Sequence, residues 1–254
     1  VTGAIVTTLL VHIHWPTHSI GPIPQSWSLA TEVSFYLTLP LMARVLRPAL
    51  RARDRAGRRN GLFLFVGLCY LLSVVFRVWI FGLDNRWTSS ALLWLPGMFD
   101  YFAIGMGLAV ARVGFEPGGV DGETRNGHTR DHETRVRNRL ERLGAPAGLW
   151  WLLGLGLFHV VSQMMGLELG LAEAAWWREI GRQFVYGAIG FCLIFPLVFG
   201  SSRGGPIRSL VASGPVEWLG TISYSIYLWH MVFIVHPWGP LADALGGVRT
   251  FDTS

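Results

Sequence analysis

The amino-acid sequence predicts an all-α fold, a polytopic transmembrane helix bundle with about six full spans and a partial one. Of the 254 residues, 51% are hydrophobic and 15% are charged, whereas a soluble domain carries about 25% charged residues. The apolar residues gather in blocks of roughly twenty, the length that crosses about 30 Å of hydrocarbon as a helix. Several of the 12 tryptophans stand near the ends of these blocks, as in interfacial aromatic belts.

The partial span comes first, because the apolar run Val1–Ile13 is too short to cross a membrane unless its beginning is missing. The prolines within His14–Ser26 block helix formation, so a loop is expected there. The full spans are expected at about 27–46, 61–82, 91–112, 148–166, 181–200 and 217–237. Residues 1–254 are expected to form a single membrane-embedded domain that is incomplete at its N-terminus and at its C-terminus.

Arginines alternate between the predicted loops. The loops 47–59, 112–147 and 201–216 hold 15 arginines, whereas the other loops hold four. The positive-inside rule therefore predicts that these three loops face the cytoplasm. The stretch 112–147 mixes arginines with acids and lacks an apolar period in its centre, so a flexible, charged cytoplasmic loop is expected at 113–147. Topology explains the basic residues, and no nucleic-acid partner is expected.

An acid within the first full span is the most informative feature of the chain. Glu32 lies in an apolar run, where an ionisable group is costly unless it faces a cavity or a partner. Ser28 and Tyr36 stand four residues on either side, so the three side chains share a helix face. Catalysis by the carboxylate is favoured, and the alternative is a structural glutamate bonded to a neighbouring helix.

A second polar face is predicted in the last full span. Ser223, Tyr227 and His230 are four and three residues apart, and Tyr224 lies beside them. His230 could relay protons, or it could donate a single hydrogen bond between helices, and the residues alone favour neither.

Other charges and histidines within or beside the spans allow less chemistry. Arg77 and Asp100 occupy neighbouring spans and could pair with each other, or Asp100 could line a water-filled cavity. His12, His14 and His18 have no acidic or thiol ligand near them in sequence, so an outer vestibule is favoured over a metal site. No nucleotide-binding loop, hydrolase elbow or zinc-protease motif is present in the sequence.

Three stretches together resemble the acyltransferase-3 family of integral membrane proteins, which O-acylate envelope glycans and some secreted glycosides. The stretch QSWSLATEVSFYL at 25–37 resembles the family's Trp-Ser-Leu-x-x-Glu-x-x-Phe-Tyr motif. The stretch LPGMFDYFAIG at 95–105 resembles its Leu-Pro span, and LGTISYSIYLWH at 219–230 resembles its Leu-Gly-x-x-Ser-Tyr-x-x-Tyr-Leu-x-His helix. Val33 replaces a second acid of many members, and no residue here matches the histidine of the family's first helix.

The resemblance implies an enzyme that moves an acyl group, expected to be acetyl, from acyl-CoA to a hydroxyl of a cell-envelope or exported carbohydrate. Catalytic roles are then implied for Glu32, Ser28, Tyr36 and His230. Substrate binding is implied for Tyr224, Tyr227, Ser223 and Asp100. Acyl-CoA is expected as a donor substrate, without a bound cofactor or metal, in the bacterial plasma membrane. The alternatives are a transporter or flippase for a carbohydrate or lipid-linked substrate, and a non-catalytic remnant.

Overall fold

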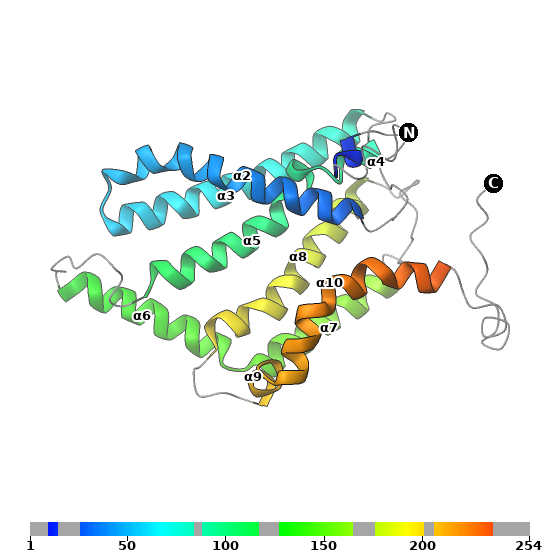
Figure 1. Cartoon of the computed structure of the whole chain (residues 1–254). Helices are drawn as coiled ribbons and strands as arrows, with labels where there is room; N and C mark the ends of the chain where they lie inside the picture. The colour runs from blue at the N-terminus through cyan, green and yellow to red at the C-terminus, as the bar shows by residue number, and fades with distance from the viewer. Residues whose placement is uncertain are drawn as a thin grey trace.

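The computed structural model describes residues 10–14, 26–83, 88–116, 127–164, 176–200 and 206–235, and within these ranges the regular elements are helices. Figure 1 shows their arrangement. The elements are η1 (His12–His14), α2 (Ser26–Arg51), α3 (Arg55–Leu83), α4 (Thr88–Ala91), α5 (Leu95–Gly114), α6 (Gly127–Gly144), α7 (Ala147–Met164), α8 (Trp176–Phe199), α9 (Pro206–Val211) and α10 (Gly214–Val235).

Each of the six predicted spans overlaps a helix, namely α2, α3, α5, α7, α8 and α10. Three described helices are long and apolar enough to cross a membrane: α2, α3 and the Trp177–Phe199 part of α8. A fourth candidate span arises if Asp131–Gly144 and Ala147–Gln163, which meet at a 62° bend, count as one. Over the described ranges the fold is thus all-helical, with three to four candidate spans, fewer than the six that the sequence predicts. Most of the predicted 14–26 loop, and residues 1–9 of the partial span, lie outside the described residues.

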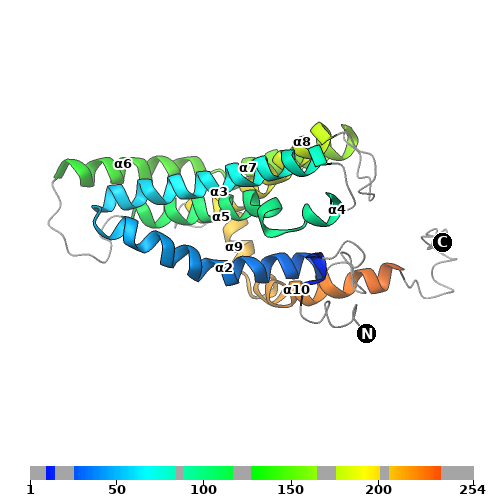
Figure 2. The ribbon, with the colours of Figure 1, turned by 90° about the horizontal axis from the view of Figure 1, so that it is seen from above.

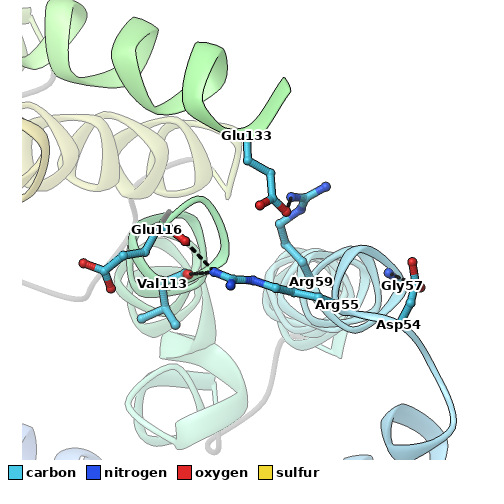
Figure 3. Close-up of polar contacts among 7 residues, drawn as sticks. All are labelled: Asp54, Arg55, Gly57, Arg59, Val113, Glu116 and Glu133. Atoms are coloured by element: carbon cyan, nitrogen blue, oxygen red, sulfur yellow. Dashed lines mark hydrogen bonds and ion pairs between the residues drawn. The ribbon is translucent and has the colours of Figure 1, made fainter. Parts of the chain in front are cut away.

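The expectation of a flexible charged loop at 112–147 is wrong over α6, which is a helix of 18 residues. Its charges pair along and across the helix. The Arg137 Nε donates to Glu141 Oε1 at 2.8 Å, one turn away. Glu133 is only 2% exposed and pairs with Arg59 of α3 at 3.3 Å (Figure 3). This partner lies 74 residues away in the chain, so no local period reveals it.

A set of charged contacts joins the start of α3 to the end of α5 (Figure 3). The Asp54 carboxylate accepts the Gly57 backbone N–H at 2.9 Å and so caps α3. Arg55 donates to the carbonyls of Val113 and Glu116, at 3.2 and 2.7 Å, where α5 ends. These residues, with Arg59 and Glu133, define the "arginine end" of the bundle, at the left in Figure 1.

The core is built on α3 and α5, which pack along each other. Phe35, Cys69 and Phe99 belong to one buried cluster that joins α2, α3 and α5. A second cluster of Leu108, Phe195 and Phe199 fastens α5 to α8. Figure 2 shows that α2 and α10 lie on one side of the molecule, away from α6, α7 and α8. Both α2 and α10 expose large apolar side chains, as expected of surfaces that face lipid.

Candidate active site

A cavity of about 610 Å³, with charged and polar side chains on a partly apolar wall, lies where α2, α3, α5 and α8 meet. Its lining residues are Trp27, Ser28, Thr31, Glu32, Arg77, Leu92, Leu93, Met98, Tyr101, Phe102, Glu179, Arg182, Gln183 and Tyr186. They come from the first turns of α2, α5 and α8, from the last turns of α3 and, for Leu92 and Leu93, from the turn before α5. The cavity therefore lies near the end of the bundle opposite the arginine end (Figure 1).

The face predicted on α2 is present. Ser28 and Glu32 both line the cavity, and the Tyr36 hydroxyl donates to Glu32 Oε1 at 3.1 Å. Tyr36 itself is 58% exposed, so it approaches the carboxylate from the open side of α2. The Thr31 hydroxyl lies 2.6 Å from the Leu93 carbonyl, which fixes α2 against the turn that precedes α5. The Glu32 carboxylate is thus held at the cavity wall by a rigid helix.

From the sequence, Asp100 was expected either to pair with Arg77 or to line a cavity, and the structure shows neither arrangement. Asp100 is buried and does not line the cavity; its carboxylate accepts from Ser73 Oγ and Gln183 Nε2, each at 3.2 Å. Within the described ranges no ion pair joins Asp100 to Arg77. Arg77, which lines the cavity, donates to the Met98 sulfur at 3.5 Å. Asp100 therefore positions Gln183, while Arg77 faces the cavity.

The sequence analysis missed the contribution of α8. Glu179, Arg182 and Gln183 line the cavity, and Glu179 and Arg182 form an ion pair one turn apart on the helix. The predicted span at 181–200 leaves Glu179 in the preceding loop and places Arg182 and Gln183 at the span boundary. The signal was available, because residues three and four apart at the start of an apolar span place polar groups on one face at membrane depth. Tyr101 and Tyr186 complete the polar wall.

The structure does not bring the predicted residues of α10 to the cavity wall. In the described part of α10, Ser223 donates to the Gly220 carbonyl at 2.7 Å, and His230 Nδ1 lies 2.5 Å from the Tyr227 carbonyl. These contacts are local to the helix, whose main packing partner is α9. Tyr224 is close enough to Glu32 for an electrostatic interaction. The first and last family motifs therefore lie on the same side of the molecule, as Figure 2 shows for α2 and α10.

The histidines near the N-terminus make structural contacts. His12 Nε2 lies 3.1 Å from the Ser26 hydroxyl, and the His14 ring packs on Trp94 with centroids 5.3 Å apart. His18 lies outside the described residues. Among the residues that the structure describes, no three histidines, cysteines or acids gather closely enough to hold a metal ion.

Fold and cavity define a helical membrane protein with a charged site between its helices. A model of the acyltransferase-3 family, described as an acyltransferase domain, matches residues 1–248. The chain belongs to this family, and it is an acyltransferase that transfers groups other than aminoacyl groups. The match favours an enzyme over a transporter. No curated protein and no solved structure matches the chain.

Proposed function

We propose that the protein is a membrane O-acyltransferase that moves an acetyl group from acetyl-CoA to a hydroxyl of a cell-envelope or exported carbohydrate. The observation that carries this proposal is which groups bond to the Glu32 carboxylate, in a chain that belongs to this family. Glu179 is neutralised by Arg182, whereas the contact that Glu32 makes among the described residues is the Tyr36 phenol. Glu32 is thus the cavity carboxylate left available for chemistry.

The reaction needs a carboxylate of this kind. The acceptor oxygen bonds to the thioester carbonyl carbon, the carbon–sulfur bond breaks, and the proton lost by the hydroxyl ends on the departing CoA sulfur. A base carries that proton between the two. Glu32 stabilises the protonated base, for which the family resemblance implies a histidine. Ser28 and Tyr36 hold the acceptor and the carboxylate by hydrogen bonds.

A groove at the other end of α2 suits the phosphates of the donor. Arg44, Arg47 and Arg51 are three and four residues apart and line a groove of about 770 Å³ with Pro40, Leu41, Ala43 and Pro48. Guanidinium groups match phosphate oxygens in geometry and charge. Arg44 lies twelve positions after Glu32, or about 18 Å along a helix. We propose that CoA docks at this groove, with its thioester extended towards the cavity.

We also propose a membrane topology for the chain. All six predicted spans cross a bacterial plasma membrane, and the loops 47–59, 112–147 and 201–216 face the cytoplasm. The cavity then opens towards the outer face and the arginine groove towards the cytoplasm. Ser223, Tyr224, Tyr227 and His230 line the path of the carbohydrate beside α2, and Asp100 acts through Gln183.

The test follows label from radioactive acetyl-CoA into carbohydrate in membranes that contain the protein. Wild type is compared with Glu32→Gln and with the control Glu217→Gln, an exposed acid on α10. We expect Glu32→Gln to lose roughly 100-fold or more of the rate and the control to lose little. Equal rates for folded Glu32→Gln and wild type would remove Glu32 from the mechanism. The donor groove is tested by Arg47→Gln, for which we expect a KM for acetyl-CoA raised roughly tenfold at unchanged kcat.

A further inference from the structure

Arg77 is a buried cation without a matching anion. Arg77 is only 6% exposed, and its Nε has no hydrogen-bond partner. The acceptor that it reaches in the described structure is the Met98 sulfur, 3.5 Å from Nη2, and a thioether is a weak acceptor. A buried charge that lacks a partner is strongly unfavourable. In a spanning helix such a charge normally faces a partner or a functional cavity.

The acids around Arg77 are already committed to other groups. Asp100 accepts from Ser73 and Gln183, and Glu179 pairs with Arg182. Asp100 and Glu179 stabilise the Arg77 charge through space, but neither forms an ion pair with it among the described residues. The donors of Arg77 therefore remain available to a molecule that enters the cavity.

The cavity next to Arg77 is large enough for a sugar. Its volume is about 610 Å³, and Gln183, Tyr101 and Tyr186 add further polar groups to the wall. Arg77 lines this cavity together with Glu32. A planar guanidinium offers paired N–H donors that fit a carboxylate or a phosphate. A neutral sugar hydroxyl would leave the charge uncompensated.

We propose that Arg77 binds an anionic group of the acceptor, a carboxylate or a phosphate, and so selects acidic carbohydrates. This inference rests on the proposed function. The acceptor is favoured over the phosphates of the donor, because the cavity lies at the end of the bundle opposite the arginine groove. Arg77 is a specificity-determining residue in this account, and it positions the acceptor hydroxyl near Glu32.

Binding is tested first without acyl transfer, so that it stands apart from the enzymatic proposal. Purified protein is heated with glucuronate, with glucose or with inorganic phosphate, and the shift in Tm is measured. We expect glucuronate or phosphate, but not glucose, to raise Tm for wild type and for the control Arg178→Gln, which lies on α8 outside the cavity wall. Arg77→Gln should abolish the shift. Stabilisation of wild type by glucose equal to that by glucuronate, or a shift that persists in Arg77→Gln, overturns the proposal.

Arg77→Lys keeps the test decisive if the glutamine variant does not fold. The lysine retains the charge but loses the paired donors, so the ligand should still raise Tm by a smaller amount; an undiminished shift would contradict the role of the guanidinium. With acetyl-CoA present, we expect Arg77→Lys to raise the KM for an acidic acceptor roughly 10- to 100-fold. The KM for acetyl-CoA should not change. A rise confined to the acetyl-CoA KM would instead assign the anion to the donor and refute an acidic acceptor.

Discussion

At the scale of single residues, the partners of each acidic side chain determine whether it is structural or available for catalysis. Asp100 accepts two hydrogen bonds and is buried, so it serves as a structural acceptor. Glu179 is held by Arg182. Glu32 is held by one phenol and lines the cavity. Residue type alone does not separate these three acids.

We expect the buried His12, which contacts the start of α2, to make stability depend on pH. His12 is fully buried, and burial, followed by the nearby charge of His14, lowers its pKa from the ordinary value of 6.5. The unfolded chain then binds the proton more readily than the folded chain. Stability should be complete above about pH 6.5 and should fall as the pH drops below it.

We expect the Tm of wild type to fall between about pH 7.5 and about pH 5.5, and the fall to be smaller in His12→Gln. Thermal unfolding in detergent at the two pH values measures both. If the two proteins lost the same number of degrees, the pH dependence would belong to other groups.

At the scale of helices, the apolar runs predicted the position of each long apolar helix, because about twenty apolar residues have few other stable conformations in a membrane. The same criterion could not predict the charged helix α6, which packs on α8 and pairs with Arg59 of α3. Nor could the apolar runs show which polar side chains lie close together in the fold. The cavity wall combines the starts of three helices with the end of a fourth, and this depends on packing rather than on local period.

Close packing at the start of α5 gives a prediction with an internal control. A Cβ at Gly97 would lie 2.6 Å from the backbone carbonyl oxygen of Leu92, whereas a Cβ at Gly105, on the same helix, would meet nothing within 4 Å. Gly97→Ala should lower the free energy of unfolding by about 1–3 kcal/mol. Gly105→Ala should leave it unchanged or raise it by up to about 1 kcal/mol. Thermal unfolding of both variants measures the difference, and equal effects would contradict the packing at Gly97.

The ion pair between α3 and α6 gives a second prediction at this scale. Glu133→Gln leaves the half-buried Arg59 without its counter-charge, which should cost about 3 kcal/mol. Glu141→Gln removes a more exposed pair with Arg137 on the same helix and should cost about 0.3–0.5 kcal/mol. Chemical denaturation in micelles compares the two. A loss at position 133 no larger than that at 141 would show that α6 is held by other contacts.

At the scale of the whole molecule, the two ends of the bundle carry different polar groups. The arginine end gathers Arg55 and Arg59 with the carbonyl end of α5, and the cavity lies at the opposite end. The helix α2 carries both the arginine groove and Glu32. One helix therefore connects the proposed donor site to the proposed site of acyl transfer. The arginine-rich loops of the sequence predicted which end of the bundle carries the arginines. The cavity could not be predicted in this way, because its wall forms only where four helices pack together.

Blocking the cavity with a thiol reagent shows whether it is the site of acyl transfer and opens outward. Ser28→Cys is made in a background without Cys69 and Cys192, both of which are buried. Trp177→Cys, exposed at the start of α8, is the control. Intact cells are treated with a charged thiol reagent that does not cross membranes, and acyl transfer to carbohydrate is then measured. We expect modification at position 28 to abolish transfer and modification at position 177 to leave it largely intact. Complete modification at position 28 with an unchanged rate would contradict it.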